Sequence, residues 1–336
     1  MTKTKRVNVL GAGSWGTTLA LMATKEENAT LLWTRNAKVA DDINTAHVNH
    51  RYLPGVMLPR TLKASCDIKE VLDCDILLVS IPVQGLRQVC ETMRSGGLRS
   101  DTALILCAKG IESGTLKLTT EIVAEILPDQ RTVAILSGPN FAKEVAMGKP
   151  TASTLACADK LTAIELAHLL GTPIFRIYPT TDIIGVQIAG AVKNVLAIAC
   201  GIARGVGLGE NAVAALVTRG LAEISRLIHA QGGNIRTVMG LSGFGDVMLT
   251  CSSLQSRNTS FGFAIGKGMG VEAALAEQDG VVEGLKTAES VYELAKRLKV
   301  EMPICNQVYE VLYRHTDIDE SIHHLLARPL VEDEIW

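Results

Sequence analysis

Residues 7–24 read VNVLGAGSWGTTLALMAT, and this stretch decides the fold. Its apolar start predicts a buried strand, its end carries a helical pattern, and the glycines between them follow the spacing GxGxxG. Gly11 permits a tight turn, Gly13 lets a pyrophosphate approach the backbone, and Gly16 allows the helix to pack closely on the strand. The helix N-terminus offers N–H groups to phosphates. The stretch therefore predicts a dinucleotide-binding turn, with a glycine turn that binds no ligand as the alternative.

The rest of the chain predicts two domains. Up to residue 181, short apolar runs alternate with helical patterns, which indicates an α/β domain with a doubly wound parallel sheet. From residue 182 the strand signals nearly vanish, so residues 182–336 are expected to form a mainly α-helical substrate and catalytic domain. The most apolar segment, Ile183–Ala203, carries Lys193 near its middle. We interpret it as a buried helix, because a central lysine is costly in a membrane span.

Composition excludes several classes of protein. The 336 residues are 47% hydrophobic and 20% charged, so a largely disordered chain is excluded. A net charge of −2 gives no support to a nucleic-acid binder or a membrane-surface binder. The eight cysteines form no CxxC pair, which is typical of buried free thiols in a reducing compartment. We expect no signal peptide, no metal site and a cytoplasmic protein.

Cofactor choice depends on the residue that follows the second strand. NAD-specific folds usually place a carboxylate there, on the ribose hydroxyls, but this chain has Arg35 and no acidic residue. An arginine can pair with a 2′-phosphate through charge-assisted hydrogen bonds. NADP(H) is therefore favoured and NAD(H) stays open, as does the alternative that Arg35 is an ordinary surface residue.

Two lysines are candidates for proton transfer. Lys193 has apolar neighbours on every helical face, and burial lowers the pKa of an ammonium group. Such a lysine can exchange a proton with an alcohol or a carbonyl near neutral pH, unless its head simply reaches water. Lys109 follows a predicted strand, and the carboxyl ends of strands face the ligand crevice in such sheets.

Two further segments carry polar groups suited to a small anionic substrate. Residues 137–142 (SGPNFA) follow a strand with small residues that let backbone approach a ligand. Asp246 lies in a glycine-rich stretch and could accept a hydrogen bond from a substrate hydroxyl or hold a lysine. Ser256, Arg257 and Asn258 bring a cation together with short donors, which suits a phosphate dianion. The alternative for Ser256 is a helix cap.

Taken together, these motifs resemble the bacterial NAD(P)-dependent glycerol-3-phosphate dehydrogenase family. The resemblance runs almost end to end through seven blocks: 11–20 (GAGSWGTTLA), 47–55 (HVNHRYLPG), 108–112 (AKGIE), 138–142 (GPNFA), 191–194 (AVKN), 245–258 and 282–284 (VEG). Several blocks in order are far more specific than GxGxxG alone. Two positions depart from the family pattern, since Asn140 replaces a common serine and Phe244 replaces a leucine. Neither is expected to change the reaction.

The resemblance implies a role for each matching residue. The implied cofactor contacts are Gly11, Gly13, Ser14, Trp15, Gly16, Arg35, His47 or His50, Lys109, Ala142, Arg257, Val281 and Glu283. The implied substrate contacts are Lys109, Gly138, Asn140, Lys193, Asp246, Ser256, Arg257 and Asn258. Within this set Lys193 is similar to the family's proton donor and acceptor, and Lys109 and Asp246 complete the implied catalytic group.

The implied reaction is reversible reduction of dihydroxyacetone phosphate by NAD(P)H. Its product, sn-glycerol 3-phosphate, is the backbone of membrane phospholipids. A homodimer is expected. Two alternatives stay open: a related dehydrogenase acting on a hydroxy acid or sugar acid, and a dinucleotide-sensing protein without chemistry.

Overall fold

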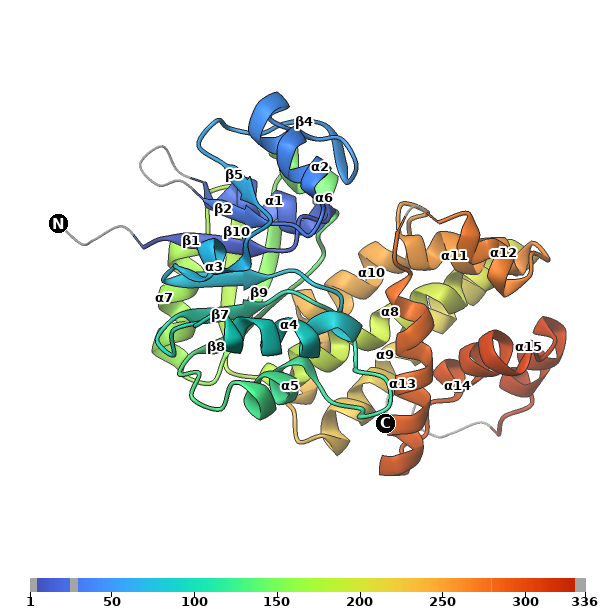
Figure 1. The fold of residues 1–336 in the computed structure, drawn as a ribbon. Helices are drawn as coiled ribbons and strands as arrows, with labels where there is room; N and C mark the ends of the chain where they lie inside the picture. Colours follow the sequence, from blue (N-terminus) through green and yellow to red (C-terminus); the bar gives the residue numbers. More distant parts are fainter. Residues whose placement is uncertain (1–4, 25–29, 279, 330–336) are drawn as a thin grey trace. The chain divides into compact units, whose positions relative to one another are not determined.

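The computed structural model describes residues 5–24, 30–278 and 280–329 (Figure 1). Packing divides the chain into two compact units. The first comprises the chain up to Ala108 together with Thr119–Ile183, and the second comprises Lys109–Leu118 together with the chain from Ile184 on. The division expected from the sequence, between residues 181 and 182, leaves residues 109–118 in the first domain. The structure instead groups this segment with the second unit.

The first unit is built on an eight-stranded sheet within the described residues, in the order β10-β9-β8-β7-β6-β1-β2-β5 (Figure 1). The strands of the sheet are β1 (Val7–Leu10), β2 (Leu31–Trp33), β5 (Lys63–Ser65), β6 (Ile76–Val79), β7 (Ala103–Leu106), β8 (Val133–Ser137), β9 (Thr151–Cys157) and β10 (Phe175–Thr180). A separate hairpin consists of β3 (Val48–Asn49) and β4 (Leu53–Met57). Chain order reverses between β1 and β6, so the ligand crevice of a doubly wound sheet is expected beside the carboxyl end of β1.

The strand expected at the apolar start of residues 7–24 is observed at residues 7–10, and a second strand, Leu31–Trp33, precedes Arg35 as expected. One feature differs from the expected parallel sheet. β8 and β9 pair antiparallel, while every other neighbouring pair in the sheet is parallel among the described strands. An apolar run indicates burial but carries no strand direction.

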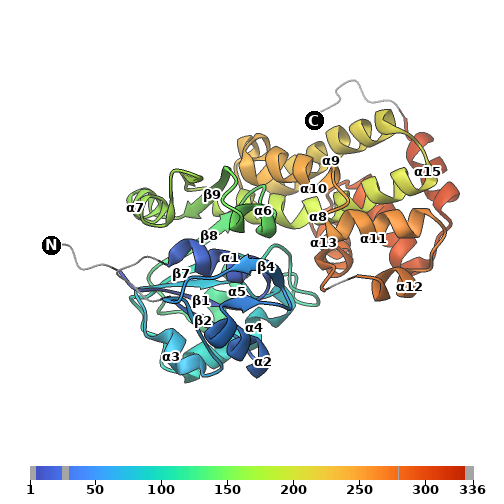
Figure 2. The same cartoon turned by 90° about the horizontal axis from the view of Figure 1, so that it is seen from above.

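Helices cover both faces of the sheet (Figure 2). The helices are α1 (Ser14–Ala23), α2 (Ala37–Asp41), α3 (Ile68–Leu72), α4 (Val83–Ser95), α5 (Thr119–Ile126), α6 (Ala142–Ala146) and α7 (Lys160–Leu170), with a short helical turn η1 (Asp42–Ala46). α1 packs with α6, and α4 packs with α5. Side chains alternate along each strand, so Val7 and Val9 of β1 join a core with Leu19 of α1.

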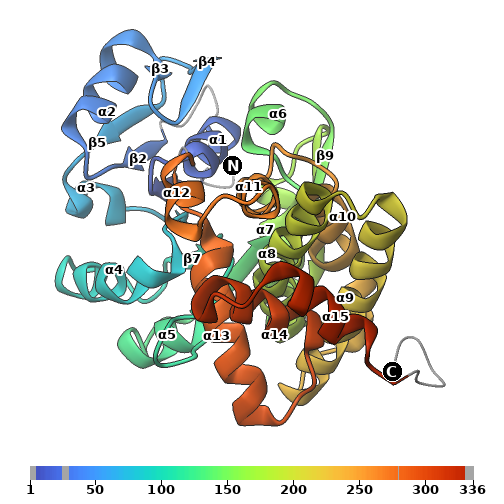
Figure 3. The ribbon, with the colours of Figure 1, turned by 90° about the vertical axis from the view of Figure 1, so that its right-hand side faces the viewer.

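In the part of the second unit that the structure describes, every secondary-structure element is a helix, whereas the segment Lys109–Leu118 is irregular (Figure 3). Its longer helices are α8 (Ile183–Val206), α9 (Glu210–Ala230), α11 (Arg257–Gly266) and α13 (Glu283–Leu298). Its shorter helices and turns are η2 (Ile235–Met239), η3 (Leu241–Gly245), α10 (Asp246–Cys251), α12 (Val271–Ala276), α14 (Pro303–Tyr309), η4 (Glu310–Arg314) and α15 (Ile318–Leu326).

α8 is the central helix of this unit. It is the one described helix with the length and hydropathy of a membrane span, but 83% of its apolar window is buried by other parts of the protein. Glycines allow its neighbours to approach closely. A Cβ at Gly201 would meet the carbonyl oxygen of Thr259 at 2.2 Å, and one at Gly262 would meet that of Ile198 at 2.2 Å. The helix is therefore packed on protein, as expected for a core helix.

Candidate active site

The glycine turn has the geometry that its sequence predicts. Gly11 adopts φ +112°, a conformation that favours glycine, and a Cβ there would meet the carbonyl oxygen of Ser80 at 2.4 Å. A Cβ on Gly16 would lie 1.7 Å from the carbonyl oxygen of Gly11. Gly13 differs, because its φ of −68° suits any residue and a Cβ would meet nothing within 4 Å. No contact with the described residues requires glycine at Gly13, which leaves open space beside the N-terminus of α1.

The loop at residues 47–55 is fastened to this turn by Asn49. The Asn49 side chain is fully buried and donates hydrogen bonds to the carbonyl oxygen of Ala12 at 3.0 Å and to Thr17 Oγ1 at 2.8 Å. Its Oδ1 accepts from the backbone N–H of Tyr52 at 3.1 Å. Ser14 adds a hydrogen bond from its Oγ to the carbonyl oxygen of Tyr52. Asn49 is thus a structural residue of the turn, and sequence reasoning passed over it.

The two histidines of this loop are placed differently. His47 adopts φ +56°, and its Nδ1 is buried without a hydrogen-bond partner among the described residues. His50 is exposed, with its Nδ1 3.5 Å from Asp42 Oδ2. Of the two, only His47 presents a buried ring nitrogen that still needs a partner.

Arg35 is exposed at the end of β2. It makes no hydrogen bond or ion pair with the residues that the structure describes. Its neighbour Asn36 caps α2, accepting from the backbone N–H of Lys38. Trp15, by contrast, is half-buried and packs edge-on against Phe175, with ring centroids 6.4 Å apart. A free guanidinium at this position can form a new ion pair with an anionic ligand.

The turn after β8 holds three predicted contacts. Gly138 has no room for a side chain, since a Cβ would lie 2.9 Å from the Cα of Ser153. The Asn140 amide donates to Thr151 Oγ1 at 2.8 Å and to the carbonyl oxygen of Ala152 at 3.1 Å, and its Oδ1 accepts from Ser153 Oγ at 2.7 Å. Ala142 begins α6 and accepts a hydrogen bond from Thr18 Oγ1. Asn140 therefore holds this turn against β9.

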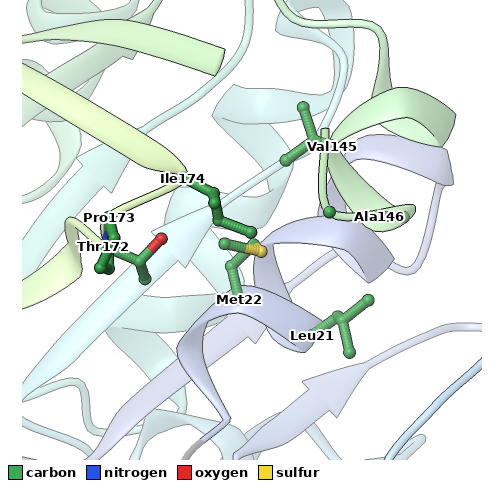
Figure 4. Close-up of a pocket in the computed structure, with 8 residues that line it drawn as sticks. Leu21, Met22, Val145, Ala146, Thr172, Pro173 and Ile174 are labelled. Carbon is green, nitrogen blue, oxygen red and sulfur yellow. The ribbon is translucent and has the colours of Figure 1, made fainter. Parts of the chain in front are cut away.

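A shallow apolar groove also lies in the first unit (Figure 4). It is lined by Leu21, Met22, Val145, Ala146, Gly148, Thr172, Pro173 and Ile174. Leu21 and Met22 belong to the C-terminal end of α1, whereas the glycine turn precedes its N-terminal end. None of the predicted site residues lines this groove.

In the second unit, the structure brings Lys109, Lys193 and Asp246 together. Lys109 Nζ donates to Asp246 Oδ2 at 2.5 Å across 137 residues of sequence. Lys193 Nζ lies 3.1 Å from the other carboxylate oxygen, Oδ1. The Lys193 side chain is 10% exposed and that of Asp246 is 2% exposed. A buried carboxylate is thus shared by two ammonium groups.

Burial and the charges of these three groups set the pKa values of Lys193 and Asp246. Burial lowers the pKa of Lys193, and the nearby Lys109 charge lowers it further, while Asp246 opposes both. Burial alone would raise the pKa of Asp246, but the Lys109 and Lys193 ammonium groups outweigh burial and hold it below its usual value. The group therefore combines a permanent carboxylate with a lysine whose proton is more easily lost than usual.

Two residues of this cluster were not predicted as site residues. Thr250 Oγ1 accepts from Lys193 Nζ at 2.8 Å and donates to Asp246 Oδ1 at 3.2 Å. Asn194 follows Lys193 and has a buried Nδ2 without a partner among the described residues. A signal for Thr250 was present, since it lies four residues after Asp246 and such residues share a helix face.

The residues predicted to bind a phosphate lie at the start of α11. Ser256 caps the helix by accepting from the backbone N–H of Thr259, which confirms the cap that sequence analysis named as an alternative. Arg257 is exposed, and its Nη1 lies 2.6 Å from where a Cβ of Gly280 would stand. Asn258 Nδ2 donates to Asn194 Oδ1 at 2.9 Å. This last bond joins the start of α11 to the residue beside Lys193.

The start of α13 contacts Asn258 as well. Asn258 Oδ1 accepts from the backbone N–H of Gly284 at 2.9 Å. Glu283 is the first residue of α13, and burial raises the pKa of its carboxyl, opposed by the charges of Lys193 and Arg257. Val281 is exposed. Glu283 therefore lies within electrostatic reach of Lys193 and Arg257.

Family models match both units. Residues 6–163 match the model described as NAD-dependent glycerol-3-phosphate dehydrogenase N-terminus, and residues 182–323 match the model of the C-terminus of the same family. The chain belongs to the NAD-dependent glycerol-3-phosphate dehydrogenase family. The fold class and the resemblance stated from the motifs are confirmed by these matches.

Individual relatives agree with the family assignment. The chain is 48% identical to glycerol-3-phosphate dehydrogenase [NAD(P)+] of Rhodospirillum rubrum over 326 residues, which covers 96% of this chain and 93% of the relative. It is 46% identical to the protein of the same name from Maricaulis maris, covering 98% of both chains. The crystal structure of glycerol-3-phosphate dehydrogenase from Coxiella burnetii superposes with a TM-score of 0.91 at 38% identity, covering 97% and 99% of the two chains.

Proposed function

We propose that Lys193 is the proton donor and acceptor in this NAD(P)-dependent glycerol-3-phosphate dehydrogenase. The reaction is the reversible reduction of dihydroxyacetone phosphate to sn-glycerol 3-phosphate. The observation that carries the proposal is the buried contact of Lys193 Nζ with Asp246 and Thr250, at 3.1 and 2.8 Å. Burial lowers the pKa of this lysine, which brings proton exchange closer to neutral pH.

The charge of the cluster suits an alkoxide that develops during ketone reduction. Lys109 and Lys193 both contact Asp246, so two ammonium groups lie at this site. Their positive charge stabilises a negative oxygen beside Lys193, and electrostatic stabilisation of this kind is usually the largest catalytic contribution. Asp246 and Thr250 position the lysine, and Lys193 Nζ gives its proton to the alkoxide.

The start of α11 is proposed to hold the substrate phosphate. Arg257 supplies the cation, and Ser256 and Asn258 supply short polar groups next to the helix N-terminus. Asn194 Nδ2 is buried without a partner among the described residues, which a substrate oxygen would provide. Anchoring the phosphate orients the ketone and converts binding energy into positioning. We keep Gly138 and Asn140 as proposed substrate contacts of the first unit.

The first unit is proposed to hold the dinucleotide. The open backbone at Gly13 fits the pyrophosphate, and the unpaired Arg35 fits a 2′-phosphate, so we propose a preference for NADP(H) over NAD(H). Ser14, Trp15, His47 and the other predicted contacts are proposed to complete the site. When bound, the reduced nicotinamide supplies the hydride. Names of the relatives carry NAD(P)+, which supports use of both cofactors.

The cellular setting is also proposed. The product is the backbone of glycerophospholipids, so we propose that the enzyme supplies their synthesis. The described cysteines are all free, which supports a reducing, cytoplasmic compartment. We propose a homodimer, division of the chain into a cofactor domain (residues 1–181) and a substrate domain (182–336), and no role for nucleic acid.

The deciding experiment measures the loss of reduced-nicotinamide absorbance with dihydroxyacetone phosphate, in parallel with NADPH and NADH. Dihydroxyacetone without phosphate and pyruvate, a keto acid, serve as comparison substrates. Rapid oxidation that requires the phosphate supports the proposal. Preference for the keto acid would favour the related hydroxy-acid dehydrogenases, and bound NADPH without oxidation of any substrate would favour a sensor.

A further inference from the structure

The connection between α12 and α13 is joined to the first turn of α11, where the phosphate anchor is proposed. Ser260 Oγ donates to Gln278 Oε1 at 2.9 Å, close to the end of α12. The backbone N–H of Gly284 donates to Asn258 Oδ1 at 2.9 Å, at the start of α13. The connection is therefore held on α11 on both sides of Gly280.

Gly280 has a backbone conformation that favours glycine, and it faces the Arg257 guanidinium. Its φ is +117°, and its N–H donates to the carbonyl oxygen of Gln278 at 2.9 Å. A Cβ on Gly280 would lie 2.6 Å from Arg257 Nη1 and 3.7 Å from Arg257 Cζ. The guanidinium therefore occupies the space that a side chain on residue 280 would need.

The end of the Arg257 side chain has few other restraints. Arg257 is exposed, and its guanidinium makes no hydrogen bond or ion pair with the residues that the structure describes. The Glu283 carboxyl lies within electrostatic reach of the guanidinium. Packing against the backbone of Gly280 therefore limits where this cation can lie.

We propose that Gly280 is a positioning residue for the substrate phosphate, because the absence of a side chain lets the Arg257 guanidinium take its place at the start of α11. This inference rests on the proposed role of Arg257 as the phosphate anchor. Ser256 and Asn258 lie at the same helix start. A phosphate monoester bound there meets the guanidinium and the helix N-terminus together.

A side chain on residue 280 would displace the guanidinium. Non-bonded atoms in contact lie about 3.5 Å apart, so Nη1 of Arg257 would have to retreat by about 1 Å from a Cβ that is now 2.6 Å away. An arginine side chain is long and flexible, so the charge moves while the fold is kept. A misplacement of about 1 Å costs up to about a hundredfold in rate.

The test compares Gly280→Ala with Gly268→Ala in the steady-state reduction of dihydroxyacetone phosphate at saturating NADPH. Gly268 is the matched control, because its φ is +92° and a Cβ there would meet nothing within 4 Å. Both changes strain the backbone, but only Gly280→Ala brings a Cβ against an arginine. Denaturant unfolding checks that both variants fold. Gly280→Asn and Gly268→Asn repeat the comparison with a residue that tolerates a positive φ better.

We expect Gly280→Ala to raise the KM for dihydroxyacetone phosphate by about tenfold, with kcat within about twofold of the wild type. Inorganic phosphate carries no ketone, and its competitive inhibition should weaken by the same factor. Gly268→Ala should leave both quantities unchanged. An equal rise in KM for the two variants would show a general effect of backbone strain and overturn the inference.

A double-variant cycle with Arg257→Ala separates this inference from the proposed function. In the Arg257→Ala background, Gly280→Ala should not raise KM further, because the two residues act through one contact. A further rise there, or a rise in KM with Arg257→Ala but not with Gly280→Ala, would overturn the inference and leave the phosphate anchor supported. If Arg257→Ala leaves KM unchanged, the proposed anchor is wrong and the inference is wrong with it.

Discussion

Replacing Asp246 with asparagine removes the charge that the buried Lys193 shares with the partly buried Lys109. The carboxylate contacts Lys109 Nζ at 2.5 Å and Lys193 Nζ at 3.1 Å, with its side chain 2% exposed. Removing one partner of a buried ion pair costs about 3–5 kcal/mol, because the other charge is left uncompensated. We expect Asp246→Asn to lower the free energy of unfolding by about this amount. The pKa of Lys193 should fall further, because the attraction of Asp246 opposes the effect of burial.

Denaturant unfolding and the pH dependence of kcat/KM test both effects. Ketone reduction needs the protonated lysine, so the pH above which the rate falls should move downward in Asp246→Asn. Glu210→Gln is the matched control, because the Glu210 side chain is 76% exposed in its 2.9 Å contact with Arg204. An exposed pair contributes about 0–1 kcal/mol, so the control should change little. An Asp246→Asn protein within about 1 kcal/mol of the wild type, with an unshifted pH profile, would refute the reasoning.

Three further predictions concern separate groups. Arg35→Ala should weaken NADPH binding by about tenfold to a hundredfold and NADH binding little, since one charge-assisted contact contributes about 1.5–3 kcal/mol. If titration shows that the variant binds both cofactors equally more weakly, Arg35 does not bind the 2′-phosphate. Arg257→Ala should raise the KM for dihydroxyacetone phosphate by a similar factor, and an unchanged KM would place the phosphate anchor elsewhere. Burial raises the pKa of Glu223 from 4.5 to about 7, although its oxygens accept from the backbone N–H groups of Ile304 and Cys305. A raised pKa means that the folded protein binds the carboxyl proton more tightly than the unfolded chain, which stabilises the fold at low pH. The unfolding free energy of the wild type, measured relative to Glu223→Gln, should therefore fall by about 3 kcal/mol between pH 4.5 and 7. A difference between the two proteins that does not change with pH contradicts this prediction.

The strand, glycine turn and helix at the start of the first unit could be predicted from the sequence because their signals are local. An apolar strand, three glycines and a helix start lie within one short stretch. Gly11 and Gly16 leave no room for a side chain, and Gly13 faces open space. The antiparallel direction of β9 was not readable, since direction depends on how the chain crosses the sheet. The helix Val83–Ser95 was missed because its polar residues hide a narrow apolar stripe, formed by Val83, Leu86, Cys90 and Met93.

The sequence names candidate site residues, and the structure adds contacts that join some of them. Lys109 was placed at the end of a strand, and its grouping with the second unit depends on residues 109–118 packing there through Ile111 and Leu118. The spacing of residues in the sequence does not predict that Lys109 and Lys193 both contact Asp246. Thr250 was missed because a threonine in a helix has many ordinary roles.

The most direct test of the account is the turnover of Lys193→Ala, measured with saturating NADPH and dihydroxyacetone phosphate and with added primary amines. General acid–base catalysis contributes about a hundredfold to ten-thousandfold, so the variant should lose at least about a hundredfold in kcat while NADPH binding is retained. Amines small enough to enter the space left by the lysine should restore part of the rate, in proportion to their acidity. Turnover within about threefold of the wild type would remove Lys193 from proton transfer and contradict the account.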